Sequence, residues 1–131
     1  MTLVVDASVA AKWLLEEAGT QQARELLMGD QPLLAPTLIL SEVANAIWKA
    51  VARGATAEPL MENLKEVPAN FSKLVSIPAL VDMALRLATH HNHPIYDCLY
   101  VALSLREAAP LVTADRRLVE RFAGIADVRL L

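Results

Sequence analysis

The chain opens on MTLVVDASVAAKWLLEE, residues Met1–Glu17, in which a short apolar run stops at a single charge. Leu3–Val5 is uniformly apolar and contains β-branched valines, which predicts a buried strand. The residues Ser8–Glu17 then carry a helical pattern, and Ser8 is placed to be the N-cap of this helix. Asp6 either caps the helix or lies at the mouth of a sheet as part of a site, and this stretch alone leaves both explanations open.

The rest of the chain repeats the alternation of short apolar strands and helices. Further strands are predicted at residues 32–36, 71–78, 110–115 and 128–131. Helices are predicted at Thr20–Met28, Thr37–Arg53, Thr56–Val67, Pro78–His90, Ile95–Ala108 and Arg116–Phe122. This alternation indicates a parallel sheet that is covered by helices on both faces, in a single domain spanning residues 1–131.

The composition limits the classes of function. Of the 131 residues, 55% are hydrophobic and 21% are charged, so the chain is globular rather than disordered. The net charge of −3 provides no general basic field, so contact with nucleic acid would depend on a local group of Lys and Arg. The single cysteine, Cys98, excludes an internal disulfide and fits a reducing cytoplasm. Without a signal peptide or a long apolar run, we expect a cytoplasmic protein with no membrane partner.

Acidic residues stand out by their surroundings. Asp6 and Asp115 directly follow predicted strands, and sites in parallel sheets form beyond the carboxyl ends of the strands. Glu42 and Asp97 lie in helices that are otherwise apolar, where a lone carboxylate is costly to bury. Carboxylates that converge without basic partners favour a hard cation such as Mg²⁺ or Mn²⁺. Their mutual repulsion is expected to raise some of their pKa values above the usual value of about 4.

Each of these acids also has an ordinary structural explanation. Asp6 and Asp115 suit the N-cap positions of the helices that follow them. Asp97 falls in the first turn of its helix, where a negative charge complements the helix dipole. Glu42 can pair with Lys49 or face water. These roles suffice one by one, but they do not explain why two acids follow strand ends and two lie in apolar helices.

Four stretches of the chain carry a family resemblance. They are VVDASVAAKWLLEE, LLAPTLILSEVANAIWKAV, PIYDCLYVALSL and APLVTADRRL. Through this ordered set, which covers nearly the whole chain, the sequence resembles the PIN-domain ribonucleases of the VapC toxin type. The resemblance implies a three-layer α/β/α fold with a short-stranded parallel sheet. It also implies endonucleolytic cleavage of RNA, a homodimer, and a cognate VapB-type antitoxin as the inhibitory partner.

The same resemblance assigns residues to a site. The metal-binding and catalytic acids that it implies are Asp6, Glu42, Asp97 and Asp115. The supporting polar groups that it implies are Ser8, Asn45 and Thr113. One or two Mg²⁺ ions, with Mn²⁺ as a substitute, would orient a water and stabilise the leaving oxygen of a phosphodiester. Arg116 and Arg117 next to this site either form a solvated helix face or contact phosphates of the RNA.

Other interpretations of the pattern remain open. A haloacid-dehalogenase-like phosphatase also has an Asp after its first strand, but it needs a second Asp two residues on, where this chain has Ser8. A metal-binding PIN module that binds RNA or protein without cutting is the alternative from a different class, and the complete set of acids disfavours it. The run of His90, His91 and His93 suits a helix end and a loop better than a metal site, and Cys98 suits a small buried residue.

The apolar content of the chain, with a mean hydropathy of +0.37, exceeds what the core of a small monomer needs. We therefore expect a homodimer. We also expect an apolar groove near the first helix and the helix of Glu42, which would accept an amphipathic antitoxin segment. Trp13 and Trp48 are core or interface residues, and the sequence does not separate these two roles.

Overall fold

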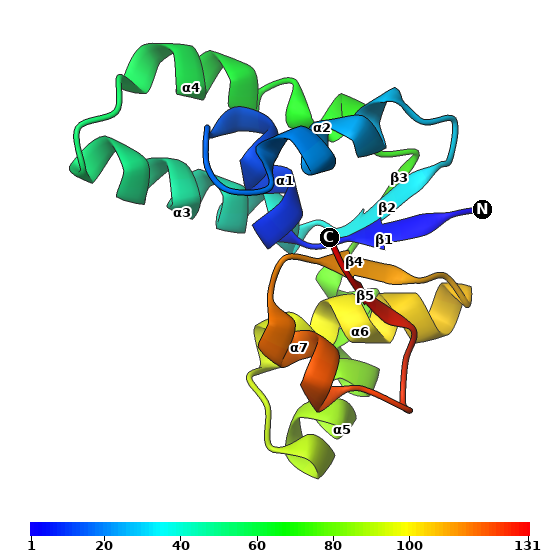
Figure 1. Ribbon diagram of the computed structural model, residues 1–131. Helices are drawn as coiled ribbons and strands as arrows, with labels where there is room; N and C mark the ends of the chain where they lie inside the picture. Colours follow the sequence, from blue (N-terminus) through cyan, green and yellow to red (C-terminus); the bar gives the residue numbers. More distant parts are fainter.

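A computed structural model describes all residues, 1–131, and its centre is a parallel five-stranded sheet (Figure 1). The strands are β1 (Leu3–Val5), β2 (Leu33–Pro36), β3 (Lys73–Val75), β4 (Leu111–Thr113) and β5 (Val128–Leu130). Their order across the sheet is β3-β2-β1-β4-β5, and every neighbouring pair is parallel. The chain thus adds β2 and β3 on one side of β1, and then β4 and β5 on the other side.

The direction of winding reverses between β1 and β4. These two strands lie side by side, with Val5 paired to Val112. A crevice forms at the carboxyl edge of such a reversal, because the connections leave the two strands in opposite directions. Asp6 directly follows β1, and Asp115 lies two residues beyond the end of β4, so the topology brings both acids to this crevice.

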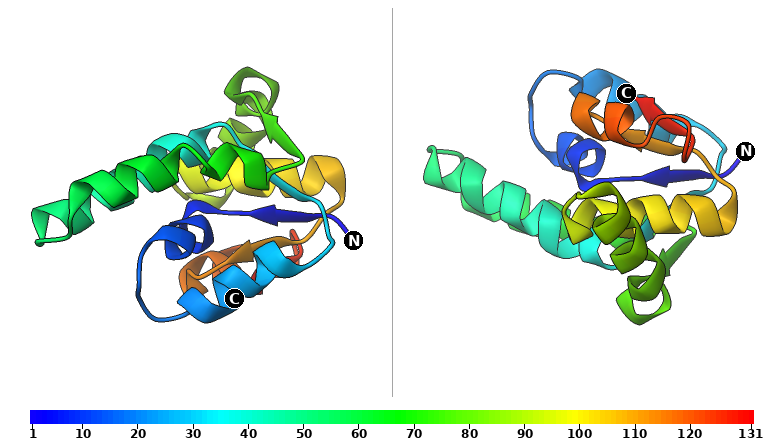
Figure 2. Two further views of the ribbon diagram at one scale, coloured as in Figure 1. Left: turned by 90° about the horizontal axis from the view of Figure 1, so that it is seen from above. Right: turned by 90° about the horizontal axis from the view of Figure 1, so that it is seen from below.

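Helices cover both faces of the sheet (Figure 2). They are α1 (Ala7–Leu14), α2 (Thr20–Met28), α3 (Leu38–Ala52), α4 (Ala57–Leu64), α5 (Val81–His91), α6 (Ile95–Glu107) and α7 (Arg116–Arg121), with 3₁₀ turns η1 (Val67–Asn70) and η2 (Ile77–Ala79). The helix α6 packs on β1 and β2 with α5 beside it, whereas α1 and α7 contact β4 from the other face. The three-layer α/β/α arrangement is therefore confirmed. None of the helices combines the length and the apolar character that a membrane span requires.

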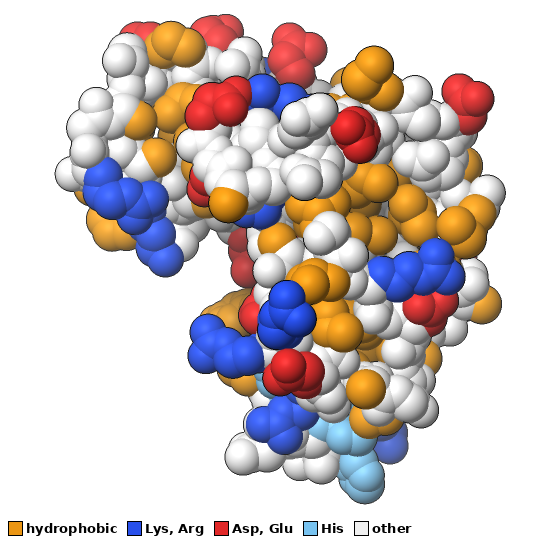
Figure 3. All heavy atoms as spheres, viewed as in Figure 1, with side chains coloured by type: hydrophobic (Ala, Val, Ile, Leu, Met, Phe, Trp, Pro, Cys, Tyr) orange, Lys and Arg blue, Asp and Glu red, His pale blue; other side chains and the backbone are white.

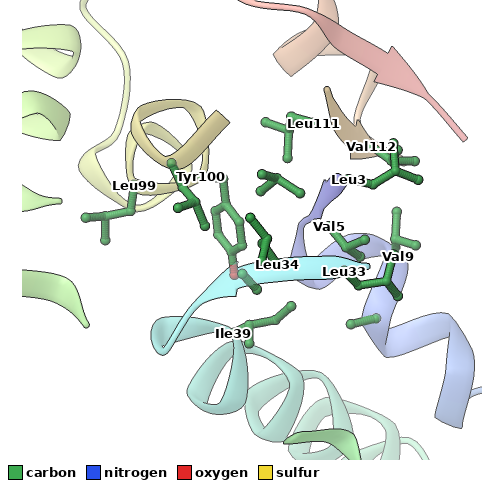
Figure 4. Packing of buried hydrophobic residues seen from close by; sticks show 14 of the residues in the cluster. Leu3, Val5, Val9, Leu33, Leu34, Ile39, Leu99, Tyr100, Leu111 and Val112 are labelled. Carbon is green, nitrogen blue, oxygen red and sulfur yellow. The ribbon is translucent and has the colours of Figure 1, made fainter. Parts of the chain in front are cut away.

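The helix α6 forms the centre of one layer, and all residues from Cys98 to Ser104 in it are buried. Figure 4 shows Tyr100 of this helix passing Leu34 of β2, with its hydroxyl directed toward α3. This burial explains why the segment around Asp97 is so apolar in sequence. In contrast, α3 and α4 extend past the sheet as a two-helix arm (Figure 1).

The two tryptophans have different environments in the structure. Trp13 of α1 is buried, its indole N–H donates to the carbonyl of Ala23 at 2.9 Å, and its ring packs on Phe71. Trp48 lies on the arm and is 65% exposed. Trp13 is therefore a core residue, while Trp48 belongs to the surface of the isolated chain.

The predicted boundaries of the first helix were wrong at both ends. Asp6, and not Ser8, is the N-cap, because the Asp6 carboxylate accepts from the backbone N–H groups of Ser8 and Val9. The helix ends at Leu14 rather than Glu17. At Leu15 the backbone is extended, and the carbonyl of Leu15 accepts a hydrogen bond from the Thr20 hydroxyl at 2.7 Å.

Prolines account for two further differences. The helix that was predicted to reach Val67 ends at Leu64, since Pro68 has no N–H to donate to the carbonyl of Leu64, and the chain continues as the 3₁₀ turn η1. The helix that was predicted to begin at Pro78 begins at Val81, after a 3₁₀ turn that contains this proline. The remaining predicted elements agree with the structure to within a few residues at their ends.

Candidate functional site

Asp6 is the buried acid of the crevice, with 6% of its surface exposed. Its position at the start of α1 lets the backbone N–H groups of Ser8 (3.0 Å) and Val9 (3.3 Å) donate to Oδ1. The Ser8 hydroxyl also donates to Oδ1, and the Thr113 hydroxyl donates to Oδ2 at 2.6 Å. All of these donors are neutral, so the negative charge of Asp6 has no Lys or Arg partner.

Ser8 and Thr113 join the two sides of the crevice. The Ser8 hydroxyl accepts from the backbone N–H of Ala114 at 2.9 Å, and the Thr113 hydroxyl accepts from the N–H of Asp115 at 3.0 Å. Each hydroxyl therefore donates to Asp6 and accepts from the turn after β4. The structure brings both of these predicted supporting residues into direct contact with Asp6.

Glu42 reaches the crevice from α3. Its Oε1 accepts a hydrogen bond from the hydroxyl of Tyr100 at 2.6 Å, and Tyr100 is 1% exposed. The ion pair of Glu42 with Lys49, which was one ordinary explanation of this acid, is absent. Asn45 lies three residues after Glu42 and is exposed. Both residues line a hollow beside α3.

Asp97 and Asp115 have the structural roles that their positions predicted. Asp97 lies in the first turn of α6, and its Oδ2 is 2.8 Å from Nε2 of His93. Asp115 is the N-cap of α7 and accepts from the backbone N–H of Arg117 at 2.9 Å. Both side chains are partly exposed, at 36% for Asp97 and 42% for Asp115. Unlike Asp6, these acids can be reached from solvent.

Two hollows meet at Asp115. The first lies between α1, α3 and the turn after β4, and its lining includes Ser8, Lys12, Glu42, Asn45, Lys49, Tyr96 and Asp115. The second lies between the start of α6 and α7, and its lining includes His93, Asp97, Asp115, Arg117 and Arg121. Figure 3 shows Lys and Arg side chains on both sides of the notch between the arm and α7, with acidic side chains at its floor. Arg116 is exposed and lines neither hollow.

Burial dominates the electrostatics of the site. It raises the pKa of Asp6 to about 6, although the hydrogen bonds from Ser8, Thr113 and Val9 oppose the shift. Burial also raises the pKa of Glu42, against the hydrogen bond from Tyr100. The negative charge of Asp97 raises the pKa of both acids, but it is the smallest of the causes. The predicted rise is therefore confirmed for Asp6 and Glu42, and repulsion by Asp97 contributes to it, but loss of hydration contributes more.

The cysteine is buried, and the histidine run lies at the end of α5 and in the turn after it. Burial raises the pKa of the Cys98 thiol to about 11, so it stays protonated at neutral pH and is not a nucleophile. The helix α5 ends at His91, and Asn92 follows in the left-handed conformation with φ of 49°. His93 lies in this turn, and its ring contacts Asp97.

Sequence patterns did not identify two hydrogen-bond partners of the acids, Tyr100 and His93. Tyr100 follows Asp97 by three residues in the same helix, but its partner Glu42 lies 58 residues away in the sequence. His93 precedes Asp97 by four residues, a spacing that makes two residues neighbours when both lie in one helix. Because His93 lies in the turn before α6, the sequence did not indicate their contact. Both residues act by hydrogen bonding to a carboxylate.

The donor set suits a hard divalent cation. The acids offer only oxygen ligands, Asp6 and Glu42 have no basic partner, and Asp97 lies near enough to raise the pKa of both. In this conformation, no three acidic, histidine or cysteine side chains lie close enough together to hold one ion. A common ion would therefore require rotation of the partly exposed acids toward Asp6, which is held by its donors on both oxygens.

The comparison with known families agrees with this fold. The model of the PIN domain matches residues 3–125, and the chain belongs to the PIN domain family. Ribonuclease VapC3 of Pyrobaculum aerophilum is 34% identical over 128 residues, which cover 95% of this chain and 98% of that protein. Exonuclease VapC9 of the same organism is 32% identical over 95 residues, which cover 72% of this chain and 70% of that protein. The predicted resemblance to VapC-type PIN domains is confirmed.

Solved structures share the whole architecture. PAE2754 from Pyrobaculum aerophilum has a TM-score of 0.76 at 27% identity, over 98% of this chain and 92% of that one. VapBC2 from Rickettsia felis, solved with a DNA fragment from its promoter, has a TM-score of 0.67 at 13% identity, over 100% and 99% of the two chains. The second likeness shows the fold alone, and it covers the arm as well as the sheet.

The burial of Asp6 predicts a specific dependence of stability on pH. Folding raises the pKa of Asp6 from 3.8 to about 6, so the stabilising state is the protonated one. The stabilisation of the fold by protonated Asp6 is complete below about pH 4 and is lost as the pH rises through about 6. Between those limits the free energy of unfolding of the parent should fall by up to about 3 kcal/mol relative to Asp6→Asn.

Urea unfolding in a chelating buffer, followed by circular dichroism at a series of pH values, measures this difference. The matched control is Asp82→Asn, because the Asp82 side chain is 84% exposed and lies outside the crevice. Parallel pH curves for the parent and Asp6→Asn would contradict the predicted cost of ionising Asp6.

Proposed function

We propose that this chain is a divalent-metal-dependent endoribonuclease and the toxin of a toxin–antitoxin pair in the cytoplasm. The observation that carries the proposal is the Asp6 carboxylate, buried between β1 and β4 without a basic partner and next to further acids. When ionised, neighbouring acids without a basic partner carry negative charge that a bound cation can neutralise. Support also comes from the relatives, whose names describe a ribonuclease and an exonuclease.

The proposed ligands of one or two Mg²⁺ ions, or of Mn²⁺ as a substitute, are Asp6, Glu42, Asp97 and Asp115. An ion held there supplies positive charge to the phosphate oxygens and lowers the pKa of an attacking water. Ser8 and Thr113 hold the Asp6 carboxylate in one orientation, and Tyr100 does the same for Glu42. Asn45 offers an exposed amide on the wall of the first hollow, where it can hydrogen-bond to RNA.

The cations around the notch offer a path for the RNA backbone. Lys49 lines the first hollow without an ion pair, and Arg117 lines the second hollow with 92% of its side chain exposed. Arg116, exposed beside it, is a further candidate for contact with phosphate. This local group supplies the attraction that a net charge of −3 does not provide over the whole molecule.

The proposed protein partners are a second copy of the chain and a VapB-type antitoxin. A hollow between α1, α3 and α4 has Leu14, Pro59 and Leu60 in its lining, which suits the apolar face of an amphipathic segment. Trp48 and Met61 expose further apolar surface on the arm. A structure of the same fold from Klebsiella pneumoniae is named as a toxin–antitoxin complex, which supports an antitoxin as the partner.

Removal of either of two acids should abolish cleavage. Purified parent protein with Mg²⁺ or Mn²⁺ is expected to cut a mixed pool of RNA, whereas Asp6→Asn and Asp97→Asn are expected to leave it intact while keeping the fold. Asp82→Asn is the control, since this acid lies on the surface of α5 and in neither hollow. Normal cleavage by either folded variant, free of contaminating nuclease, would remove that acid from the mechanism.

A circular single-stranded RNA in the same assay distinguishes the modes of cleavage. An endonuclease opens the circle, whereas an exonuclease needs a free end and leaves it closed. Binding of the circle and of Mn²⁺ without any cleavage would instead favour the alternative of a PIN module that does not cut. Sequencing of the 5′ ends of the fragments then identifies the cleaved sites.

A divalent ion should stabilise the parent at neutral pH. Binding to the folded state alone adds roughly 2.7 kcal/mol when the free ion is at a hundred times its dissociation constant. We expect the melting temperature to rise with Mn²⁺ or Mg²⁺ but not with a sodium salt of matched ionic strength. The double variant Asp6→Asn/Asp97→Asn should lose this rise, and its metal-free form should melt at or above the parent. Equal shifts in both proteins would show that the ion binds elsewhere.

The proposed homodimer can be tested without the antitoxin. Multi-angle light scattering at high micromolar concentration should give twice the chain mass of 14.3 kDa. The physical reason is the apolar surface that the isolated chain leaves exposed, including Trp48. A monomer under those conditions would count against the dimer.

A further inference from the structure

His93 is the side chain that contacts Asp97. Its Nε2 lies 2.8 Å from Oδ2 of Asp97, and the side chain of His93 is only 13% exposed. An ionised carboxylate can only accept a hydrogen bond, so a bond to ionised Asp97 requires the proton on Nε2. No other hydrogen bond engages the Asp97 carboxylate, and Oδ1 is therefore left for another partner.

The position of the His93 ring is fixed by its surroundings. The ring packs edge-on against Phe122, which is fully buried, with 5.4 Å between the ring centroids. The backbone N–H of His93 donates to the carbonyl of Ala88 at 3.1 Å. The left-handed Asn92 precedes it, and Pro94 follows with its fixed φ. The imidazole is thus held before any ligand arrives.

We propose that His93 is a positioning residue that orients Asp97 for a divalent cation. The proposal rests on the proposed function, in which Asp97 is a ligand of the ion. By holding Oδ2, the imidazole restricts the rotation of the carboxylate and leaves Oδ1 free for the ion. Residues that hydrogen-bond to a metal ligand commonly affect the affinity of the metal site, because a ligand that is already oriented loses less freedom on binding.

A purely structural role of His93 is the competing explanation, and the chain contains a matched control for it. His91 packs edge-on against the same Phe122, also with 5.4 Å between the ring centroids. Unlike His93, His91 makes no contact with an acid. Substitution of each histidine by Phe retains a ring against Phe122, and only His93→Phe removes a donor to Asp97.

Titration calorimetry of the metal-free protein with Mn²⁺ alone, at neutral pH, tests the proposal without an activity measurement. His93→Phe is expected to weaken the affinity for Mn²⁺ on the order of 10- to 100-fold, the usual effect of losing such a partner. His91→Phe should bind as the parent does. His93→Gln places an amide donor at the position and should recover part of the loss. Melting curves without metal verify that each variant is folded.

The outcomes separate this proposal from the proposed function. If the parent itself does not bind Mn²⁺, the proposed metal site fails. If the parent binds and His93→Phe binds equally well, Asp97 needs no positioning by His93 and this inference is wrong. An equal loss in His91→Phe and His93→Phe would also overturn it, because packing on Phe122 would then be the cause. Should His93→Phe not fold, the same comparison is made with His93→Gln and His93→Ala.

Discussion

The hydrogen bonding of the Asp6 carboxylate between β1 and β4 is the interaction on which the rest of the site depends. A buried carboxylate is costly unless donors replace its lost hydration. Here the donors are the first turn of α1 and the hydroxyls of Ser8 and Thr113. Because these hydroxyls also accept from the turn after β4, satisfying Asp6 fixes how the two strand ends meet. The residual cost appears as a raised pKa.

The buried helix α6 extends this constraint to the other acids. It crosses β1 and β2, so its first turn places Asp97 beside the crevice. One turn later, Tyr100 passes through the core (Figure 4), and its hydroxyl donates to Glu42 of α3. The site thus combines one acid that is fully fixed with others that are partly exposed. This division suits the proposed uptake of a divalent ion and of RNA from solvent.

Sequence patterns predicted the architecture because its signals are local. Uniformly apolar strands and intervening helical segments indicate a covered parallel sheet, whatever the details of packing. The same patterns misplaced the ends of three helices. At Asp6 the capping geometry depends on the turn itself, and near Pro68 and Pro78 the backbone changes to 3₁₀ turns. They indicated the repulsion that helps to raise the pKa values of Asp6 and Glu42, but not the larger effect of burial, because sequence does not show how far each acid is buried.

By itself, the sequence determined the order of strands and helices, the position of an acid after β1 and after β4, and the family. Each of these follows from neighbours in the chain. Only the tertiary structure decided which group satisfies each acid: Thr113 lies 107 residues from Asp6, and Tyr100 lies 58 from Glu42. Helical and strand periodicity states which face a side chain occupies, but not which distant side chain it meets. That choice is made by the packing of α3 and α6 against the sheet, which brings polar groups together where water is excluded.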